Sequence, residues 1–280
     1  MDILKNSLDV QSTCCQLQGT IAFVPTMGNL HAGHMQLVDA AKQLADHVVV
    51  SIFVNPLQFG DSEDFSSYPR TLEQDIEKLK SLNVDLLFTP DGRHILPADI
   101  NTTTFVEVPA LSDILEGECR PHHFRGVTTI VNKLFNIVQP DVAVFGKKDF
   151  QQLMIIQQMV NDLNMPVSIV GEETVRENDG LAMSSRNSRL DPGERQQASV
   201  LLTALSEAQT RILSRDKDHH DIEDAMKCML QQAGFKIDYF TSRNAANLAP
   251  VDAQTTDLVI LAAAYLGSTR LIDNLSFSLQ

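Results

Sequence analysis

The sequence between residues 21 and 34 reads Ile21-Ala22-Phe23-Val24-Pro25-Thr26-Met27-Gly28-Asn29-Leu30-His31-Ala32-Gly33-His34, and it is the most informative part of the chain. Residues 21–24 form an apolar run typical of a buried strand. The apolar residues that follow recur with the period of a helix that has one core face: Leu37, Val38, Ala41 and Leu44. His31 and His34 therefore lie at a helix N-terminus, where backbone N–H groups and the helix dipole attract anions. Because side chains three residues apart share a face, we expect both imidazoles to point at the same phosphate.

Two commoner phosphate motifs do not fit this stretch. Gly28 and Gly33 have the spacing of a P-loop, but His34 and Met35 occupy the positions where that loop needs Lys and Ser or Thr. No glycine pattern follows a strand in the manner of a dinucleotide fingerprint either. The remaining alternative is that the two histidines only cap a turn. Their position around a glycine at a strand-to-helix junction favours anion binding instead.

Apolar runs alternate with helical patterns through the first part of the chain. The predicted strands cover residues 21–24, 48–54, 84–88, 142–145 and 167–170, and the predicted helices cover 34–46, 70–82, 124–138 and 149–163. This alternation predicts an α/β fold with a Rossmann-like doubly wound parallel sheet that is covered on both faces. Beyond about residue 175, helices at 193–214 and 220–233 precede strands at 236–241, 257–265 and 270–273. We therefore predict two domains, residues 1–174 and a smaller α+β domain of residues 175–280.

The polar motifs of the first domain follow predicted strands. In parallel sheets of this kind, ligands bind beyond the carboxyl ends of the strands. The two histidines follow the first strand, residues 55–60 follow the second, and residues 146–149 follow a later one. A fourth polar segment, residues 179–187, supplies two hydroxyls and a guanidinium that suit a triphosphate. We expect these segments to form one phosphate-binding site.

Composition and charge argue against several classes of protein. The formal net charge of -14 disfavours broad binding to nucleic acid, which usually needs a basic face. The longest apolar runs are about half of a membrane span, and the N-terminus lacks the pattern of a secretory signal. The cysteines show neither zinc-type pairs nor a disulfide framework, which suits a reducing compartment: Cys14, Cys15, Cys119 and Cys228. We expect a cytoplasmic protein that binds neither nucleic acid nor membranes.

Two histidine-rich segments allow more than one interpretation. Residues 216–224 resemble a metal cluster because His219 and His220 lie among acidic residues, but their charge density favours a solvated helix start. Residues 120–126 precede a predicted helix and contain closely spaced basic side chains. They are either a solvated loop or a flap over an active site, since long loops at the mouth of a sheet often carry function.

Taken together, these motifs resemble those of the pantothenate synthetase family, the pantoate–β-alanine ligases of the adenylate-forming superfamily with the His-x-Gly-His signature. The likeness runs from about residue 20 to the C-terminus, and further segments carry it: Tyr68-Pro69-Arg70-Thr71, Leu115-Glu116-Gly117 and His123-Phe124-Arg125-Gly126-Val127. The resemblance implies that ATP and pantoate form pantoyl adenylate and pyrophosphate, after which β-alanine attacks the adenylate and releases pantothenate and AMP. This is the last step of pantothenate biosynthesis.

The same resemblance implies roles for individual residues. His34, His31 and Lys148 are the catalytic candidates, with His34 as the proton donor and Lys148 reaching the phosphates. The residues implied to bind ATP are Met27, Gly28, Asn29, Leu30, His31, Ala32, Gly33, His34, Gly146, Lys147, Lys148, Asp149, Val175, Met183, Ser184, Ser185 and Arg186. Of these, Val175 would lie near adenine, and residues 183–186 would close over the triphosphate from the C-terminal domain, which acts as a lid.

The resemblance also implies sites for the other two substrates. Gln58 and Gln152 are expected to bind pantoate, and Gln58 and Asn55 are expected at the β-alanine position. Amides satisfy hydroxyl and carboxylate groups without adding buried charge. A magnesium ion bridging the phosphates is expected on charge grounds. Asp75 is predicted either as a neighbour of that ion or as an exposed residue on an acidic helix face.

The family further implies a homodimer formed through the larger domain. Two residues depart from the family pattern. Lys147 stands where acidic or amide residues are frequent, and His122 stands where glycine is usual. The departures leave the reaction class intact, but they bear on the charge beside Lys148 and on the flexibility of residues 120–126.

Two other functions remain compatible with the motifs. One is a different His-x-Gly-His enzyme, such as a fragment of a class I aminoacyl-tRNA synthetase or a small-molecule adenylyltransferase. The other is a nucleotide-sensing module without catalysis. The acidic charge disfavours binding to tRNA, and a sensor needs no second polar pocket of the kind that Asn55, Gln58 and Gln152 imply. Pyrophosphate release on addition of pantoate would separate the enzyme from the sensor.

Overall fold

The chain folds into two compact units. The structure is a computed structural model that describes residues 1–280 apart from 61–64, 67, 98, 100–101, 216–217 and 280. The first unit comprises Met1–Lys147 and Gln152–Glu173, and the second comprises Lys148–Gln151 and Thr174–Gln280. This grouping differs from the predicted domains 1–174 and 175–280 chiefly at Lys148–Gln151, which belong with the second unit. Within the described residues, no helix is both long enough and apolar enough to span a membrane.

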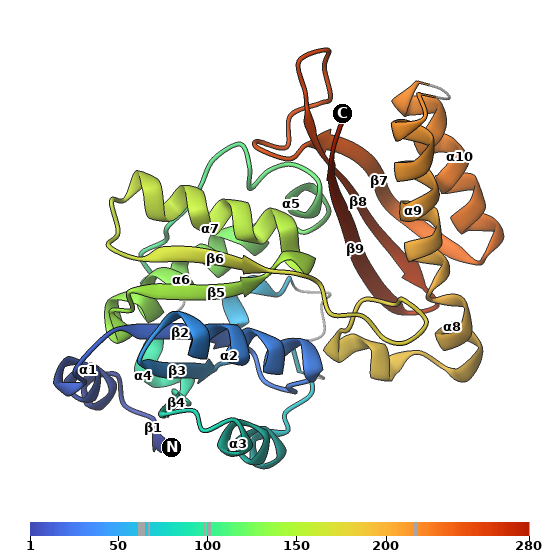
Figure 1. Cartoon of the computed structure of the whole chain (residues 1–280). Helices are drawn as coiled ribbons and strands as arrows, with labels where there is room; N and C mark the ends of the chain where they lie inside the picture. Colours follow the sequence, from blue (N-terminus) through green and yellow to red (C-terminus); the bar gives the residue numbers. More distant parts are fainter. Residues whose placement is uncertain (61–64, 67, 98, 100–101, 216–217, 280) are drawn as a thin grey trace. The chain divides into compact units, whose positions relative to one another are not determined.

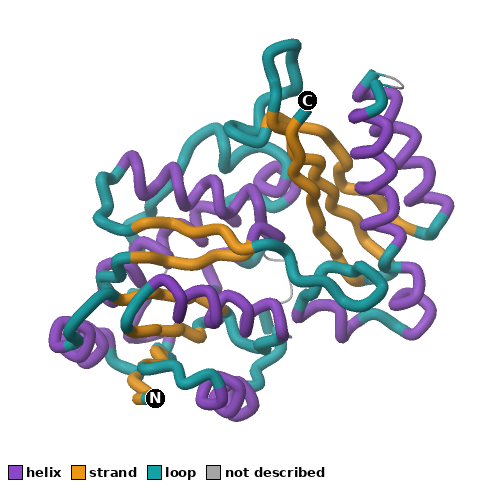
Figure 2. Tube along the Cα trace, viewed as in Figure 1, coloured by secondary structure: helices purple, strands orange, loops and turns teal. Residues whose placement is uncertain are grey.

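The first unit is built on a parallel sheet of six strands, seen in Figures 1 and 2. The strands are β1 (Asp2–Leu4), β2 (Ile21–Thr26), β3 (His47–Ile52), β4 (Leu86–Phe88), β5 (Val142–Gly146) and β6 (Ser168–Glu172). Their order across the sheet is β1-β4-β3-β2-β5-β6. The chain therefore builds outward from β2 in one direction and from β5 in the other. The place where the order reverses, between β2 and β5, is where open α/β sheets bind their ligands.

Helices cover both faces of this sheet because successive strand residues point to opposite sides. The helices of the unit are α1 (Ser7–Gln16), α2 (Ala32–Leu44), η1 (Pro56–Gln58), α3 (Leu72–Ser81), α4 (Gly92–Ile95), α5 (Glu116–Cys119), α6 (His123–Val138) and α7 (Phe150–Asp162). Ile21 and Phe23 of β2 share a buried cluster with residues of α1, α6 and α7. Ala22 and Val24 share another cluster with residues of α2 and α3. The sheet is doubly wound, as the sequence predicts.

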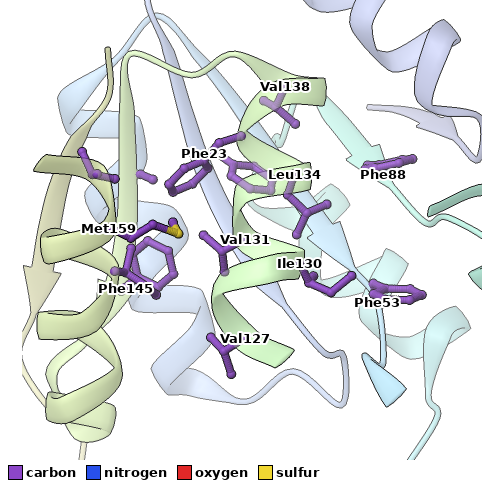
Figure 3. Packing of buried hydrophobic residues seen from close by; sticks show 14 of the residues in the cluster. Phe23, Phe53, Phe88, Val127, Ile130, Val131, Leu134, Val138, Phe145 and Met159 are labelled. Atoms are coloured by element: carbon purple, nitrogen blue, oxygen red, sulfur yellow. The ribbon is translucent and has the colours of Figure 1, made fainter. Parts of the chain in front are cut away.

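Helix α6 supplies one side of the larger cluster. Its buried residues recur at helical spacing and form a single apolar stripe, drawn in Figure 3: Val127, Ile130, Val131, Leu134 and Val138. Phe23 and Phe145, from neighbouring strands, pack in the same cluster. Each such side chain contributes about 1.5–3 kcal/mol on burial. This packing fixes the strands whose carboxyl ends carry the polar motifs.

The second unit is a smaller α+β assembly. Its helices are η4 (Ser185–Arg189), α8 (Pro192–Gln197), α9 (Val200–Leu213) and α10 (His219–Gln232), and its strands are β7 (Phe235–Asn244), β8 (Asp257–Leu266) and β9 (Thr269–Ser278). The strands form an antiparallel sheet in the order β7-β8-β9. Residues of α9, α10 and the sheet share one apolar cluster. The predicted fold class, a doubly wound parallel sheet with a smaller α+β part, is confirmed.

Several details were not predicted. The sequence pattern missed α1, because Val10 and Cys14 are its buried residues and two positions make no recognisable stripe. It also missed β1, which is only three residues long. The predicted helix 193–214 is wrong as a single element, since α8 ends at Gln197 and α9 begins at Val200. Ala198 keeps right-handed helical dihedrals across the break, which explains why the periodicity continues through it.

Candidate functional site

The two histidines of the motif form the N-terminus of α2. His31 is the N-cap residue, and its Nδ1 accepts the Gly33 N–H at 3.2 Å. In return, Nδ1 of His34 accepts the His31 N–H at 3.3 Å, which completes a capping box. The ring centroids are 4.1 Å apart. The capping role that the sequence left as an alternative is therefore real, and it leaves the rings side by side at a helix N-terminus.

These contacts determine which ring nitrogen carries the proton. A nitrogen that accepts a hydrogen bond from an N–H group is unprotonated, so each neutral ring carries its hydrogen on Nε2. His31 and His34 thus have the same tautomer, assigned from the hydrogen-bond network. Each presents an Nε2–H donor beside the N–H groups of the helix terminus. Two such donors on one helix turn suit an anion with several oxygen atoms.

The turn between β2 and α2 requires unusual backbone conformations. Gly28 has φ +84, and a Cβ at this position would lie 3.0 Å from Ile52 Cγ2. Asn29 follows with φ 50, also in the left-handed region. At the end of β2, Thr26 Oγ1 donates to the Ser51 carbonyl at 2.8 Å. The turn therefore leaves the sheet at the switch between β2 and β5 in a shape that glycine permits.

Asp75 of α3 lies directly beneath this turn. Its side chain is fully buried, and its two oxygen atoms accept the N–H groups of Asn29 and Leu30, each at 2.8 Å. It is therefore not the exposed residue that one of the two sequence interpretations predicted. The other interpretation, a place beside the magnesium ion, stays a prediction. Among the residues that the structure describes, no group of three or more His, Cys, Asp or Glu side chains could hold a metal ion.

The predicted carboxamide residues are connected to the turn. Asn55 is 1% exposed, and its Nδ2 donates to Gln58 Oε1 at 3.0 Å and to the Gly126 carbonyl at 3.1 Å. Gln58 Nε2 in turn contacts Met27 Sδ at 2.9 Å. The structure thus brings together Met27, Asn55 and Gln58. Gln152 lies on the first turn of α7, and its predicted contact with pantoate stays a prediction.

A network that the sequence analysis did not assign holds the Gln58 main chain. His123 Nδ1 contacts the Gln58 carbonyl at 2.8 Å, and Arg120 donates to the same carbonyl at 3.3 Å. Arg120 also donates to Glu116 Oε1 at 3.2 Å and contacts His123 Nε2 at 3.2 Å. Because the Nδ1 contact is with a carbonyl, His123 carries its hydrogen on Nδ1. The i, i+4 spacing of Glu116 and Arg120 was the available signal for this pair.

Helix α6 begins within residues 120–126, where the sequence predicted a solvated loop or a flap. His123 is the first residue of α6 and is buried, so the segment from there onward is neither a solvated loop nor a flap. Gly126 approaches η1 so closely that a Cβ would lie 2.1 Å from the Leu57 carbonyl oxygen. His122 has φ 67, in the region that favours glycine. Glycine, which is usual at this position in the family, adopts this conformation without strain, whereas His122 adopts it at a cost.

The two adjacent lysines have different surroundings. Both lie in η3 (Lys147–Asp149), directly after β5. The Lys147 ammonium forms an ion pair with Glu173 on the surface of the first unit. In the second unit, the main-chain carbonyl of Lys148 accepts a hydrogen bond from Asn274 Nδ2 at 2.9 Å. The two neighbours therefore have different partners, a carboxylate for the Lys147 side chain and a side-chain amide for the Lys148 main chain.

The second unit positions the remaining predicted ATP residues. The Met183 N–H donates to the Val175 carbonyl at 2.9 Å, which brings these two residues together. Ser184 is the N-cap of η4, and its Oγ accepts the Arg186 N–H at 3.2 Å. Near the start of the segment, a hydrogen bond from Arg195 lowers the pKa of the Asp179 carboxyl below its ordinary value. The hydroxyls and the guanidinium thus lie on one short helical turn.

The acidic segment near residue 219 begins a helix, as predicted. Asp218 caps α10 by accepting the His220 N–H at 2.9 Å. His220 lies 3.2 Å from Asp224 on the exposed side of the helix. Asp216, the first residue of the predicted cluster, lies outside the described residues. The described part of this segment is a solvated helix start.

Comparison with known proteins points to one family. A family profile described as pantoate-beta-alanine ligase matches residues 2–276. Among curated relatives, the pantothenate synthetase of Shewanella loihica is 57% identical over 258 residues, which are 92% of this chain and 91% of that protein. These matches span almost the whole of the chain.

Solved structures agree. A crystal structure of pantothenate synthetase from Thermus thermophilus superposes with a TM-score of 0.92 at 40% identity, covering 98% of this chain and 99% of that one. The pantoate-beta-alanine ligase from Francisella tularensis, crystallised with beta-gamma ATP and beta-alanine, has a TM-score of 0.80 at 34% identity and covers 98% and 97%.

Proposed function

The chain belongs to the pantoate–β-alanine ligase family, and from that premise we propose that it condenses pantoate with β-alanine in two steps. ATP and pantoate first form pantoyl adenylate and pyrophosphate. The amine of β-alanine then attacks the acyl carbon, which releases pantothenate and AMP. Family membership also sets aside the aminoacyl-tRNA synthetase fragment and the nucleotide sensor as alternatives.

The observation that carries this proposal is the contact between Gln58 and Met27. It joins a carboxamide cluster, suited to a polar acid, to the turn that carries two imidazole donors. The Gln58 Nε2 group has two hydrogens, of which one is directed to Met27 Sδ. We assign the second to pantoate, with Asn55 orienting the amide beside the β-alanine position. An acid held there lies next to the donors that meet the α-phosphate.

The histidines and Lys148 have a clear chemical task in the first step. A carboxylate oxygen leaves poorly from carbon, and adenylation replaces it with a phosphate that leaves readily. Negative charge develops on the α-phosphate and on pyrophosphate during that exchange. Donors that are already oriented stabilise this charge without reorganisation. We assign His31 and His34 to the phosphates through their Nε2–H groups, with His34 as the proton donor, and Lys148 to the departing pyrophosphate.

Segments of the second unit are assigned to the rest of the nucleotide. Val175 lies beside adenine in this proposal, and the hydroxyl and guanidinium groups of residues 183–186 bind the triphosphate. The family relative crystallised with a nucleotide supports ATP as the substrate. Magnesium enters as part of that substrate, because the triphosphate oxygens are hard ligands of the kind Mg²⁺ prefers. Gln152 completes the pantoate site.

We further propose that the protein works in the cytoplasm as a homodimer formed through the larger unit. Its cysteines are free thiols, which suits a reducing compartment: Cys14, Cys15, Cys119 and Cys228. Burial raises the pKa of the Cys14 thiol to about 11, so this thiol is unreactive near neutral pH. Sedimentation equilibrium of the purified chain measures the oligomeric state.

Isotope exchange tests the two-step reaction directly. With labelled pyrophosphate, the protein should transfer label into ATP when pantoate is present and β-alanine is absent. Addition of β-alanine should then produce AMP and pantothenate in equal amounts. Exchange that strictly requires β-alanine would contradict a separate adenylation step. AMP formation with other hydroxy acids as fast as with pantoate would contradict the assigned substrate.

A further inference from the structure

The negative charge of the buried Asp75 carboxylate is stabilised by hydrogen-bond donors of the first unit. Its Oδ1 accepts the Leu30 N–H at 2.8 Å, and its Oδ2 accepts the Asn29 N–H at 2.8 Å and the Thr71 hydroxyl at 3.2 Å. Asp75 also lies in the first turn of α3, where the helix dipole stabilises negative charge. Three donors and a helix terminus offset the cost of burying this charge without a cation.

A second side chain of α3 binds the same turn, but as a hydrogen-bond donor and not as an acceptor. Lys78, one turn further along, donates from Nζ to the Leu30 carbonyl at 2.6 Å. Leu30 is itself buried and is followed directly by His31, the N-cap of α2. Helix α3 therefore binds both the N–H and the carbonyl of the residue that precedes the first catalytic candidate.

The turn needs such support because its backbone is strained. Gly28 and Asn29 are consecutive residues with positive φ, of 84 and 50. In this conformation the N–H groups of Asn29 and Leu30 converge on one carboxylate. A non-glycine residue such as Asn29 adopts positive φ at an energetic cost. The hydrogen bonds to a charged acceptor are strong enough to retain it.

We propose that Asp75 is a positioning residue for His31 and His34, which holds the phosphate-binding turn in its active shape, and that it is not a ligand of magnesium. Lys78 assists it through the Leu30 carbonyl. The proposal rests on the proposed function only for its kinetic tests, because adenylation is the step that uses the two histidines. Asp75 itself touches no substrate.

Asp75→Asn is the central variant. An amide has one oxygen, so it accepts one of the two N–H groups and faces the other with its own NH₂ group. We expect pantoate-dependent pyrophosphate exchange to lose about 10- to 100-fold in kcat, with little change in the KM for pantoate. Glu73→Gln is the matched control, because it removes an exposed charge from the same helix turn without touching residues 27–34. It should exchange at the wild-type rate.

A double-mutant cycle separates positioning from a general effect on folding. In a background that carries both His31→Ala and His34→Ala, Asp75→Asn should cost less than about twofold, since the groups that it positions are absent. The magnesium concentration for half-maximal exchange should be unchanged. An equal cost in both backgrounds, or a raised magnesium requirement in Asp75→Asn, would overturn the proposal.

A second readout does not depend on activity. In ¹⁵N spectra of the full chain, Asp75→Asn should move the ring signals of His31 and His34 and leave those of His47 and His220 in place. Unmoved signals for the first pair would overturn the proposal, whether or not the wild type exchanges pyrophosphate. Absence of exchange in the wild type would instead contradict the proposed function. If Asp75→Asn does not fold, Lys78→Met takes its place in both tests, with a loss of about 2- to 10-fold in kcat expected.

Discussion

Residues 27–34 of the first unit and residues 183–187 of the second are both short polar segments that begin a helix, yet their conformations are secured differently. The first is held by Asp75, which lies 45 residues from Leu30 in the sequence. In the second, Ser184 accepts from Arg186 and Asn187 donates to the Ala182 carbonyl, over two and five residues. One turn is shaped by a distant helix, and the other by bonds between near neighbours.

This difference predicts how each segment responds to mutation. A segment shaped from a distance presents its donors in a fixed geometry before substrate binds, which favours interactions made in the transition state. A segment shaped by its own neighbours can change conformation as a unit, which suits a group that closes over a bound nucleotide. Changes in the first should therefore lower kcat, and changes in the second should mainly raise the KM for ATP.

The largest effect is expected for His34→Ala. This change removes an Nε2–H donor from the turn, and loss of such a donor typically costs about 10²- to 10³-fold in rate. Loss of the capping contact to the His31 N–H should lower the free energy of unfolding by only about 0.5–2 kcal/mol. His47→Ala is the control, because His47 lies at the opposite end of the sheet, at the start of β3. Near-normal pyrophosphate exchange by a stable His34→Ala protein would return this residue to a capping role alone.

Lys147 and Lys148 are neighbours in the chain, but we expect their substitution to have very different effects on catalysis. Lys148→Ala should lose about two orders of magnitude in pantoate-dependent exchange, because its ammonium is assigned to charge that develops on pyrophosphate. Lys147→Ala should lose little, since its ion pair with Glu173 is exposed and such pairs contribute about 0–1 kcal/mol. Parallel assays of the two variants decide the assignment. Equal impairment, or a greater loss for Lys147→Ala, would mean that this loop is assigned in the wrong register.

Ser184→Ala should have a smaller and different effect. It removes the N-cap of η4, and such a loss costs about 1 kcal/mol. We expect the KM for ATP to rise about fivefold, which corresponds to that free energy, while kcat stays close to the wild-type value. Ser188→Ala, in the same helix but not at its cap, is the matched control. A fall in kcat without a change in the KM for ATP would contradict the expected difference between residues 27–34 and residues 183–187.

The smallest effect is expected at two helix starts. His122 precedes α6 with φ 67, so His122→Gly should raise the free energy of unfolding by about 0.5–1 kcal/mol. His220 lies inside the first turn of α10, where glycine should instead lower stability by about 1 kcal/mol. Urea unfolding of the two variants measures both changes. Opposite signs would show that the conformation, and not the residue type, sets the cost.

The anion site around His31 and His34 could be predicted from the sequence because its strand, turn and helix follow one another directly in the chain. Apolar alternation located β2 and α2, and the glycine and the two imidazoles between them indicated an anion site. The same locality explains the correct start of α10 near residue 219. Asp75 could be named as a candidate from the family pattern, but its burial beneath the turn could not be predicted, because its partners come from another part of the chain.

Local sequence thus specified the type of most elements, the positions of the polar motifs and the family to which they correspond. Dihedral preferences and the apolar period depend on residues a few positions apart, so they are legible without a structure. The strand order β1-β4-β3-β2-β5-β6, the burial of Asp75 under the turn and the contact of His123 with the Gln58 carbonyl depend on the folded chain. They arise because buried polar groups must find hydrogen-bond partners, and which partners are within reach depends on how distant strands and helices pack.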